Sequence, residues 1–149
     1  RAWDAGLVVV VAAGNNGPRT MSITTPGISR KVITVGCSDD DREVLVGGNR
    51  MVDYSGRGPT AACICKPDLV APGCSVVSCS SRADKYTIKS GTSMSTPIVS
   101  GAVALLLERF PDMSNKDVKL RLRESSVDIG LPRNQQGWGL LDVGKMIGK

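Results

Sequence analysis

The chain has 149 residues, of which 41% are hydrophobic and 22% charged, and these proportions are typical of one soluble globular domain. Its net charge is +5, but Lys and Arg are scattered and aromatic residues make up only 3%, which argues against nucleic acid as a partner. The longest apolar run, residues 6–13, is too short to span a membrane.

The first half of the chain is predicted to form mainly strands and turns. Residues 1–5 resemble the end of a helix that Gly6 stops. Residues 7–13 are mostly β-branched with no polar alternation, which predicts a strand buried on both faces, and residues 31–36 predict a second one. Residues 42–54, with Gly-Gly-Asn near their centre, predict a surface hairpin.

The second half combines short strands with the main helices. Residues 66–73 predict a short strand closed by a Pro-Gly turn, and residues 75–80 and 85–89 predict two more strands. The helix expected over 93–109 is apolar nearly all round and should be buried.

Two shorter helices follow. Ser114 caps one that runs to about Ser125, with Asp117 completing an acidic capping box, and residues 142–147 predict the other. The fold expected from these elements is α/β, with a mostly parallel central sheet, helices on both sides and a run of hairpins between.

Ser93 stands at the start of the long helix, within residues 91–97, which read GTSMSTP. A serine there is most often a simple N-cap. It is also where a hydrolase can present a nucleophile, because backbone N–H groups and the helix dipole stabilise an oxyanion. Gly91 permits a close approach before the serine, and Pro97 is tolerated in the first turn. A serine nucleophile normally needs a base, yet the chain contains no histidine.

Residues 91–97 resemble the nucleophile motif of the subtilisin-like serine proteases, Gly-Thr-Ser-Met-Ala-x-Pro, with Ser95 in place of the alanine. The resemblance extends over essentially the whole chain, with further family-like segments at residues 9–17, 32–36, 54–59, 67–73 and 137–142.

The resemblance implies a serine endopeptidase that works through an acyl-enzyme. Ser93 is then the nucleophile and a backbone donor to the oxyanion, and Asn15 is the side-chain donor. Taken alone, Asn15 reads as a turn residue that tolerates positive φ. Small residues imply a low, apolar wall that suits a large hydrophobic substrate side chain. The implied substrate-binding residues are Ala12, Ala13, Gly14 and Thr92.

The departures from the family pattern concern the rest of the catalytic triad. In the family both the Asp and the His precede the strand expected at residues 7–13, and neither is present here. Residues 1–149 are therefore expected to be the C-terminal portion of one catalytic domain, inactive alone. The expected partners are a protein or peptide substrate, the missing N-terminal part of the domain and further copies of the chain. The alternative is a pseudoprotease, a binding or sensing module with this fold.

The cysteines and carboxylates do not decide which cofactors the protein binds or in which cellular compartment it lies. An odd count of five cysteines predicts free thiols, although a disulfide between the 63/65 and 74/79 clusters is an alternative. Their spacing and the lack of histidine argue against a metal site, and no cofactor is expected in this chain. By the resemblance, Asp68 touches a weak cation site, and calcium is an option for the full-length protein. From general exposure alone, Asp68 is a surface or turn carboxylate. Most family members are secreted, but five thiols also fit a reducing compartment.

Overall fold

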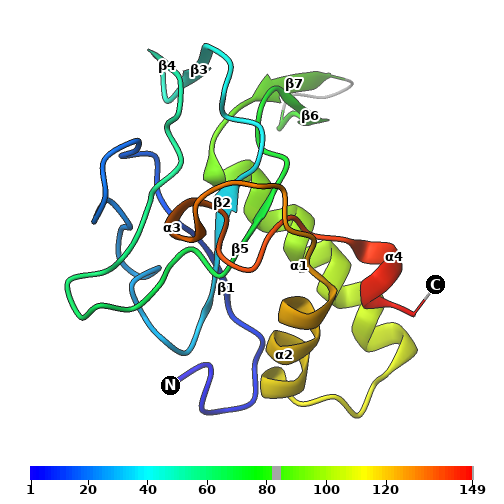
Figure 1. The fold of residues 1–149 in the computed structure, drawn as a ribbon. Helices are drawn as coiled ribbons and strands as arrows, with labels where there is room; N and C mark the ends of the chain where they lie inside the picture. Colours follow the sequence, from blue (N-terminus) through cyan, green and yellow to red (C-terminus); the bar gives the residue numbers. More distant parts are fainter. Residues whose placement is uncertain (82–84, 149) are drawn as a thin grey trace.

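The computed structural model describes residues 1–81 and 85–148, and Figure 1 shows their arrangement. None of the helices in these two ranges has the length and apolar character needed to cross a membrane. In chain order the elements are β1 (Val10–Ala12), β2 (Ile33–Cys37), β3 (Val44–Val46), β4 (Asn49–Met51), β5 (Leu69–Ala71), β6 (Val76–Cys79), β7 (Tyr86–Lys89), α1 (Thr92–Arg109), α2 (Asn115–Ser125), α3 (Arg133–Gln136) and α4 (Val143–Met146).

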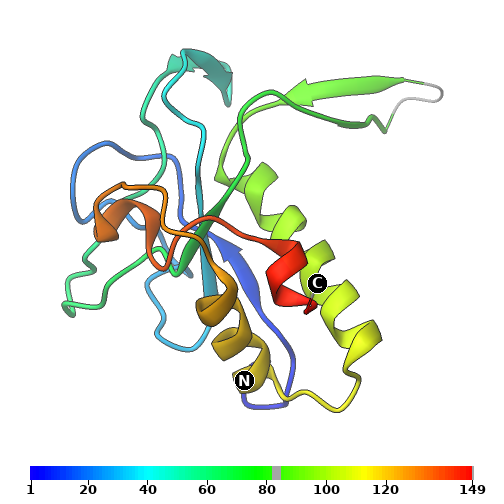
Figure 2. The same cartoon turned by 45° about the vertical axis from the view of Figure 1, so that its right-hand side comes forward.

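A parallel sheet of three strands, in the order β1-β2-β5, forms the centre of the structure. Helix α1 packs across all three strands, and Figure 2 shows it running along one side of the sheet. The side chains between them form the main core, to which α2 and α4 also contribute; its fully buried members include Ile33, Val35, Leu69, Val99, Leu106, Val118 and Met146. The prediction of an α/β fold with a parallel sheet flanked by helices is confirmed.

Strand β2 is buried on both faces, as predicted for residues 31–36. Its second face, however, is covered by loops in the described part of the chain, and not by helices as expected. The Thr34 hydroxyl donates to Gly27 O at 2.7 Å. A Cβ on Gly36 would lie 3.0 Å from Ser55 Oγ and 3.1 Å from Pro67, so glycine lets these loops approach the strand closely.

Strand β1 and helix α1 are less buried than their sequences predict. β1 covers only three residues of the expected range 7–13, and all three are half-buried. It is an edge strand, and the chain supplies no strand beyond it among the described residues. Helix α1 buries one face, while Leu105 on another face is 50% exposed. The apolar residues of β1 and α1 suit a buried environment, but some of them are not covered by other residues in the described part of the chain.

The local turn and capping signals are confirmed, although residues 2–6 form turns and not the end of a helix as predicted for residues 1–5. Gly6 adopts φ +88°, and Leu7 N donates to Ala2 O at 3.2 Å, which is the hydrogen bond of a Schellman motif. Ser114 and Asp117 form the reciprocal capping box that begins α2. The hairpin expected within residues 42–54 is β3-β4, and β6 pairs with β7 in a second hairpin; both project from the end of the molecule at which α1 begins (Figure 1).

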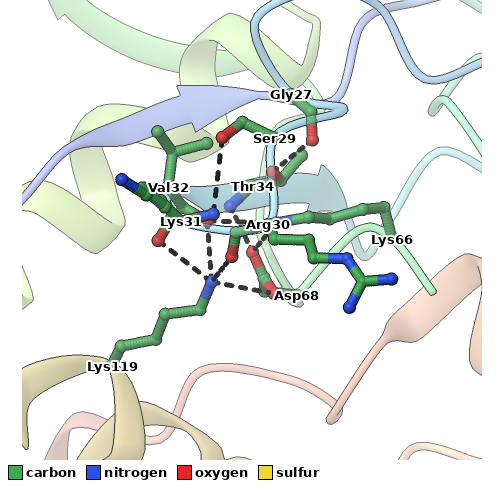
Figure 3. Close-up of polar contacts among 9 residues, drawn as sticks. All are labelled: Gly27, Ser29, Arg30, Lys31, Val32, Thr34, Lys66, Asp68 and Lys119. Atoms are coloured by element: carbon green, nitrogen blue, oxygen red, sulfur yellow. Dashed lines mark hydrogen bonds and ion pairs between the residues drawn. The ribbon is translucent and has the colours of Figure 1, made fainter. Parts of the chain in front are cut away.

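At the amino ends of β2 and β5, a buried carboxylate meets two lysines (Figure 3). Asp68 Oδ2 accepts from Thr34 N at 2.8 Å and from Lys66 Nζ at 2.5 Å, and Lys119 Nζ lies 3.5 Å from Asp68 Oδ1. Lys66 is 1% exposed, and its ammonium also donates to Val32 O at 3.0 Å. The charge of Asp68 is thus compensated although the residue is 6% exposed, and it is not the surface carboxylate that was expected as one alternative.

Lys119 connects α2 to the segment that leads into β2. Its ammonium donates to Arg30 O at 2.8 Å, Lys31 O at 3.2 Å and Val32 O at 2.9 Å. It also lies 5.8 Å from the centre of the Trp3 ring and 6.0 Å from that of Trp138. Burial lowers the pKa of Lys119, and the negative charge of Asp68 opposes this shift. These contacts hold α2 against the amino end of the sheet.

We expect Lys66→Met to destabilise the fold strongly, because it removes the ammonium closest to a buried carboxylate. Breaking one side of a buried ion pair costs about 3–5 kcal/mol, which urea unfolding followed by circular dichroism measures directly. Lys116→Met, on an exposed part of α2, is the control and should change the free energy of unfolding by less than about 0.5 kcal/mol. Equal effects of the two substitutions would show that the Asp68 ion pair contributes nothing to stability.

Candidate active site

Ser93 is the second residue of α1 and is exposed at the end of the helix that faces the two hairpins. No hydrogen bond to its hydroxyl is seen among residues 1–81 and 85–148. An exposed serine at a helix N-terminus, with nothing occupying its oxygen, has the geometry required of a nucleophile that awaits a base. It does not act as the N-cap, because Gly91 holds that position.

Gly91 has a conformation that other residues avoid. Its φ is +139° and its ψ is 160°, and a Cβ at this position would lie 3.3 Å from Asn15 Nδ2. With no side-chain cap on α1, backbone groups define the turn: Gly91 N donates to Gly73 O at 2.9 Å, and Met94 N donates to Gly91 O at 2.8 Å. Gly91, the first residue of the GTSMSTP segment, is therefore needed for both the turn and the approach of Asn15.

Asn15 is brought to the start of α1 by the loop that follows β1. Its Oδ1 accepts from Thr92 N at 3.0 Å and from Thr92 Oγ1 at 3.1 Å. A backbone N–H can only donate, so the carboxamide oxygen must face Thr92 and the Nδ2 donors must point elsewhere. Gly14 N completes the arrangement by donating to Thr92 Oγ1 at 3.2 Å. Thr92, expected only as a substrate contact, thus orients the Asn15 amide.

The three small residues before Asn15 differ in accessibility. Ala12 and Gly14 are half-buried, whereas Ala13 has no exposed surface, so its side chain cannot contact a substrate in this conformation. Thr24, which sequence reasoning did not single out, lies behind them: its backbone N donates to Ala13 O at 2.9 Å, and a Cβ on Gly14 would lie 2.8 Å from its Cγ2. Spacing alone gave no signal for Thr24, because this contact depends on how the loop folds back.

A base for Ser93 is absent from the described residues. The chain has no histidine, and three aspartates that could assist one have other partners. Asp4 Oδ1 lies 2.6 Å from Lys31 Nζ, Asp53 Oδ1 lies 3.2 Å from an Arg57 guanidinium nitrogen, and Asp39 binds backbone N–H groups. The structure therefore brings together Ser93, Asn15 and Thr92, but no proton acceptor.

The candidate cation site at Asp68 does not fit a metal. Lys66 and Lys119 already balance the charge of its carboxylate, and Lys119 takes up the neighbouring backbone carbonyl oxygens. Elsewhere in the two described ranges, no cluster of three or more His, Cys, Asp or Glu side chains has the arrangement of a metal site.

The five cysteines are free thiols, which agrees with the simpler of the two expectations. Cys37 is buried, and burial raises its thiol pKa to about 12, so it remains protonated and unreactive at neutral pH. Cys63, Cys65 and Cys79 are exposed. Cys74 is half-buried and directly follows Gly73.

Comparison with known proteins gives consistent results. The chain is 42% identical over 138 residues to serine protease AprX of Bacillus subtilis (strain 168), covering 84% of this chain and 31% of AprX. It is 33% identical over 138 residues to the halolysin-like extracellular serine protease Nep of Natrialba magadii, covering 93% of this chain and 23% of Nep. The solved S218A mutant of the PatA protease domain superposes with a TM-score of 0.74 at 27% identity, over 97% of this chain and 48% of that one. The chain thus spans between 23% and 48% of the length of these proteins.

The model of the subtilase family, Peptidase_S8, matches residues 1–139, which is nearly all of the sequence. The parallel sheet, the serine at the start of α1 and the similarity to known serine proteases agree with this match. The chain belongs to the subtilase family of serine proteases.

Proposed function

We propose that this chain supplies the nucleophile and the oxyanion hole of a serine endopeptidase, and that a further segment of the same catalytic domain supplies the base. One observation carries the proposal: Thr92, the residue before Ser93, binds the Asn15 carboxamide oxygen, while the Nδ2 donors have no hydrogen-bond partner among residues 1–81 and 85–148. A simple turn asparagine has no need of this orientation, whereas an oxyanion donor depends on it. We refer to the chain together with the proposed further segment as the parent protein.

In the reaction, Ser93 Oγ attacks the carbonyl carbon of the scissile peptide bond, and its proton passes to the base of the further segment. The negative charge that develops on the carbonyl oxygen is stabilised by Asn15 Nδ2, by the Ser93 backbone N–H and by the positive end of the α1 dipole. The base then protonates the leaving amine, and an acyl-enzyme remains on Ser93. Water, activated by the same base, hydrolyses this ester and restores the serine.

The outer edge of β1 is the proposed docking site of the further segment. The outer edge of β1 has unpaired backbone groups, and Leu7, Val8, Val9 and Val10 line a hollow of about 380 Å³ together with Ser100 and Val103 of α1. Leu7 is 60% exposed. A strand added parallel to β1 would satisfy the edge and cover this apolar surface. We propose that the segment carrying the base occupies it, so that docking and completion of the active site are one event.

The proposal includes an extracellular location. It is supported by the similarity to Nep, which is described as an extracellular serine protease and matches 93% of this chain.

We expect Ser93→Ala to abolish both peptide hydrolysis and labelling by a fluorophosphonate probe in the parent protein, because each needs the serine oxygen. Asn15→Ala should retain substrate binding but lower kcat by about 10²–10³, the loss measured in subtilisin when the equivalent donor is removed. Hydrolysis of a chromogenic peptide and probe labelling measure these effects. Asn16→Ala, which changes the exposed neighbour of Asn15, is the control and should leave kcat unchanged. A parent protein that neither turns over peptides nor reacts with the probe contradicts the proposal and favours a pseudoprotease.

We expect the isolated chain to self-associate through the uncovered β1 edge and to hydrolyse no peptide. Leu7→Lys should reduce association, since it places a charge on the apolar surface beside the edge. Leu45→Lys is a matched control, because Leu45 is also well exposed, at 63%, but lies on the β3-β4 hairpin. Light scattering at several concentrations distinguishes the variants. A monomeric wild-type chain, or equal effects of the two lysines, would show that the β1 surface is not the docking site.

A further inference from the structure

Asp39 lies two residues beyond the end of β2, beside the segment that leaves β5. Its Oδ1 accepts hydrogen bonds from Gly73 N at 2.7 Å, from Cys74 N at 3.1 Å and from Cys37 Sγ at 3.0 Å. Bonds from N–H groups to a charged carboxylate are stronger than those to a neutral acceptor. Asp39 therefore fixes the backbone of residues 73 and 74 against the end of the central strand.

Gly73 in turn holds the nucleophile turn, by which we mean residues 91–93. Its carbonyl oxygen accepts from Gly91 N at 2.9 Å and from Tyr54 Oη at 3.3 Å. A Cβ on Gly73 would overlap Ser95 Oγ and would lie 3.0 Å from Gly91 O. Gly73 is thus in close contact with the start of α1 on one side and with the Asp39 carboxylate on the other. Because neighbouring atoms surround Gly73 closely, a shift of Gly73 would displace these neighbours as well.

The start of α1 depends on contacts from outside the helix, of which this is one and the Thr92–Asn15 hydrogen bonds are the other. Ser, Thr, Asp or Asn usually caps a helix and fixes its first turn. Here the N-cap is Gly91, which has no side chain to do so, and the Gly73 carbonyl is the group that fixes its backbone N–H. The position of Ser93, two residues later, is consequently set from outside the helix.

We propose that Asp39 is a positioning residue for Ser93, acting through the Gly73 carbonyl and the Gly91 N–H. The proposal rests on the proposed function, in which Ser93 is the nucleophile. Asp39 touches neither substrate nor the reacting atoms. Its role is to keep the nucleophile turn within the few tenths of an ångström that attack on a carbonyl requires.

The test compares Asp39→Ala and Asp39→Asn with wild type in the parent protein. Asp39→Ala removes the acceptor and should lower kcat by about 10²-fold, the size of effect that a 1 Å misplacement can cause, while KM changes less than about twofold. Asp39→Asn keeps an oxygen acceptor without the charge and should lower kcat by only about three- to tenfold, since neutral bonds are weaker. Hydrogen exchange at the Gly91 amide should accelerate in the same order, whatever the activity.

Two controls separate positioning from general stability. Asp40→Asn alters an adjacent carboxylate, 3% exposed, that accepts from Ser55 N at 2.7 Å and, in the described part of the chain, forms no hydrogen bond with Gly73; it should lower Tm without lowering kcat in the folded protein. Asp41→Asn, at an exposed position, should change neither. If the Asp39 variants fold but keep wild-type kcat and wild-type Gly91 exchange, or if Asp40→Asn lowers kcat equally, the proposal is overturned.

If the proposed function itself fails, the experiment gives a different result. In that case the wild-type parent protein itself neither reacts with a fluorophosphonate probe nor hydrolyses peptides. The exchange of the Gly91 amide still reports whether Asp39 fixes the nucleophile turn. Should Asp39→Ala fail to fold, Asp39→Asn gives the decision, because wild-type kcat together with wild-type Gly91 exchange in that variant contradicts the proposal.

Discussion

The pair of hydrogen bonds from Thr92 to Asn15 Oδ1 joins the two parts of the chain on which the site is built. One part is the loop after β1, and the other is the start of α1, 77 positions later in sequence. The bonds orient the Asn15 amide and also bind the loop to the helix, so Asn15 and Ser93 cannot move independently. The geometry of the candidate site is therefore a consequence of tertiary packing, and not of either segment alone.

The parallel sheet is held by polar groups at both ends, with the apolar core between them. At the amino ends of β2 and β5, Asp68 is compensated by Lys66 and Lys119. At the carboxyl ends, the Asp39 carboxylate binds backbone N–H groups of residues 73 and 74. Asp68 is buried and Asp39 is half-buried, and a carboxylate removed from water is costly unless it is paired or accepts several hydrogen bonds. The two residues satisfy that condition in different ways. The first consolidates the fold, whereas the second lies directly behind the nucleophile turn.

Much of the fold could be predicted because its signals are local. The apolar run at residues 31–36, the capping box of Ser114 and the glycines of the β3-β4 hairpin each determine their own neighbourhood. The apolar run alone does not predict the exposure of β1, since an apolar strand has the same pattern whether its neighbour belongs to the same chain or to another segment; only the expected lack of the N-terminal part of the domain does. Within the candidate site, the motif singled out Ser93 and Asn15, but the orienting role of Thr92 and the contacts of Asp39 depend on long-range packing. The Lys66–Asp68 pair had a usable signal: residues two apart in an extended segment share a face.

The open edge of β1 has a consequence for when the proposed peptidase can act. If the base arrives with the segment that completes the sheet, a partly folded chain holds the Asn15–Thr92 arrangement but no means to activate its serine. Proteolysis then begins only when the last structural layer is in place, and hydrolytic activity reports complete folding. Such an order protects the nascent chain, whose unfolded segments would otherwise be the nearest substrates available.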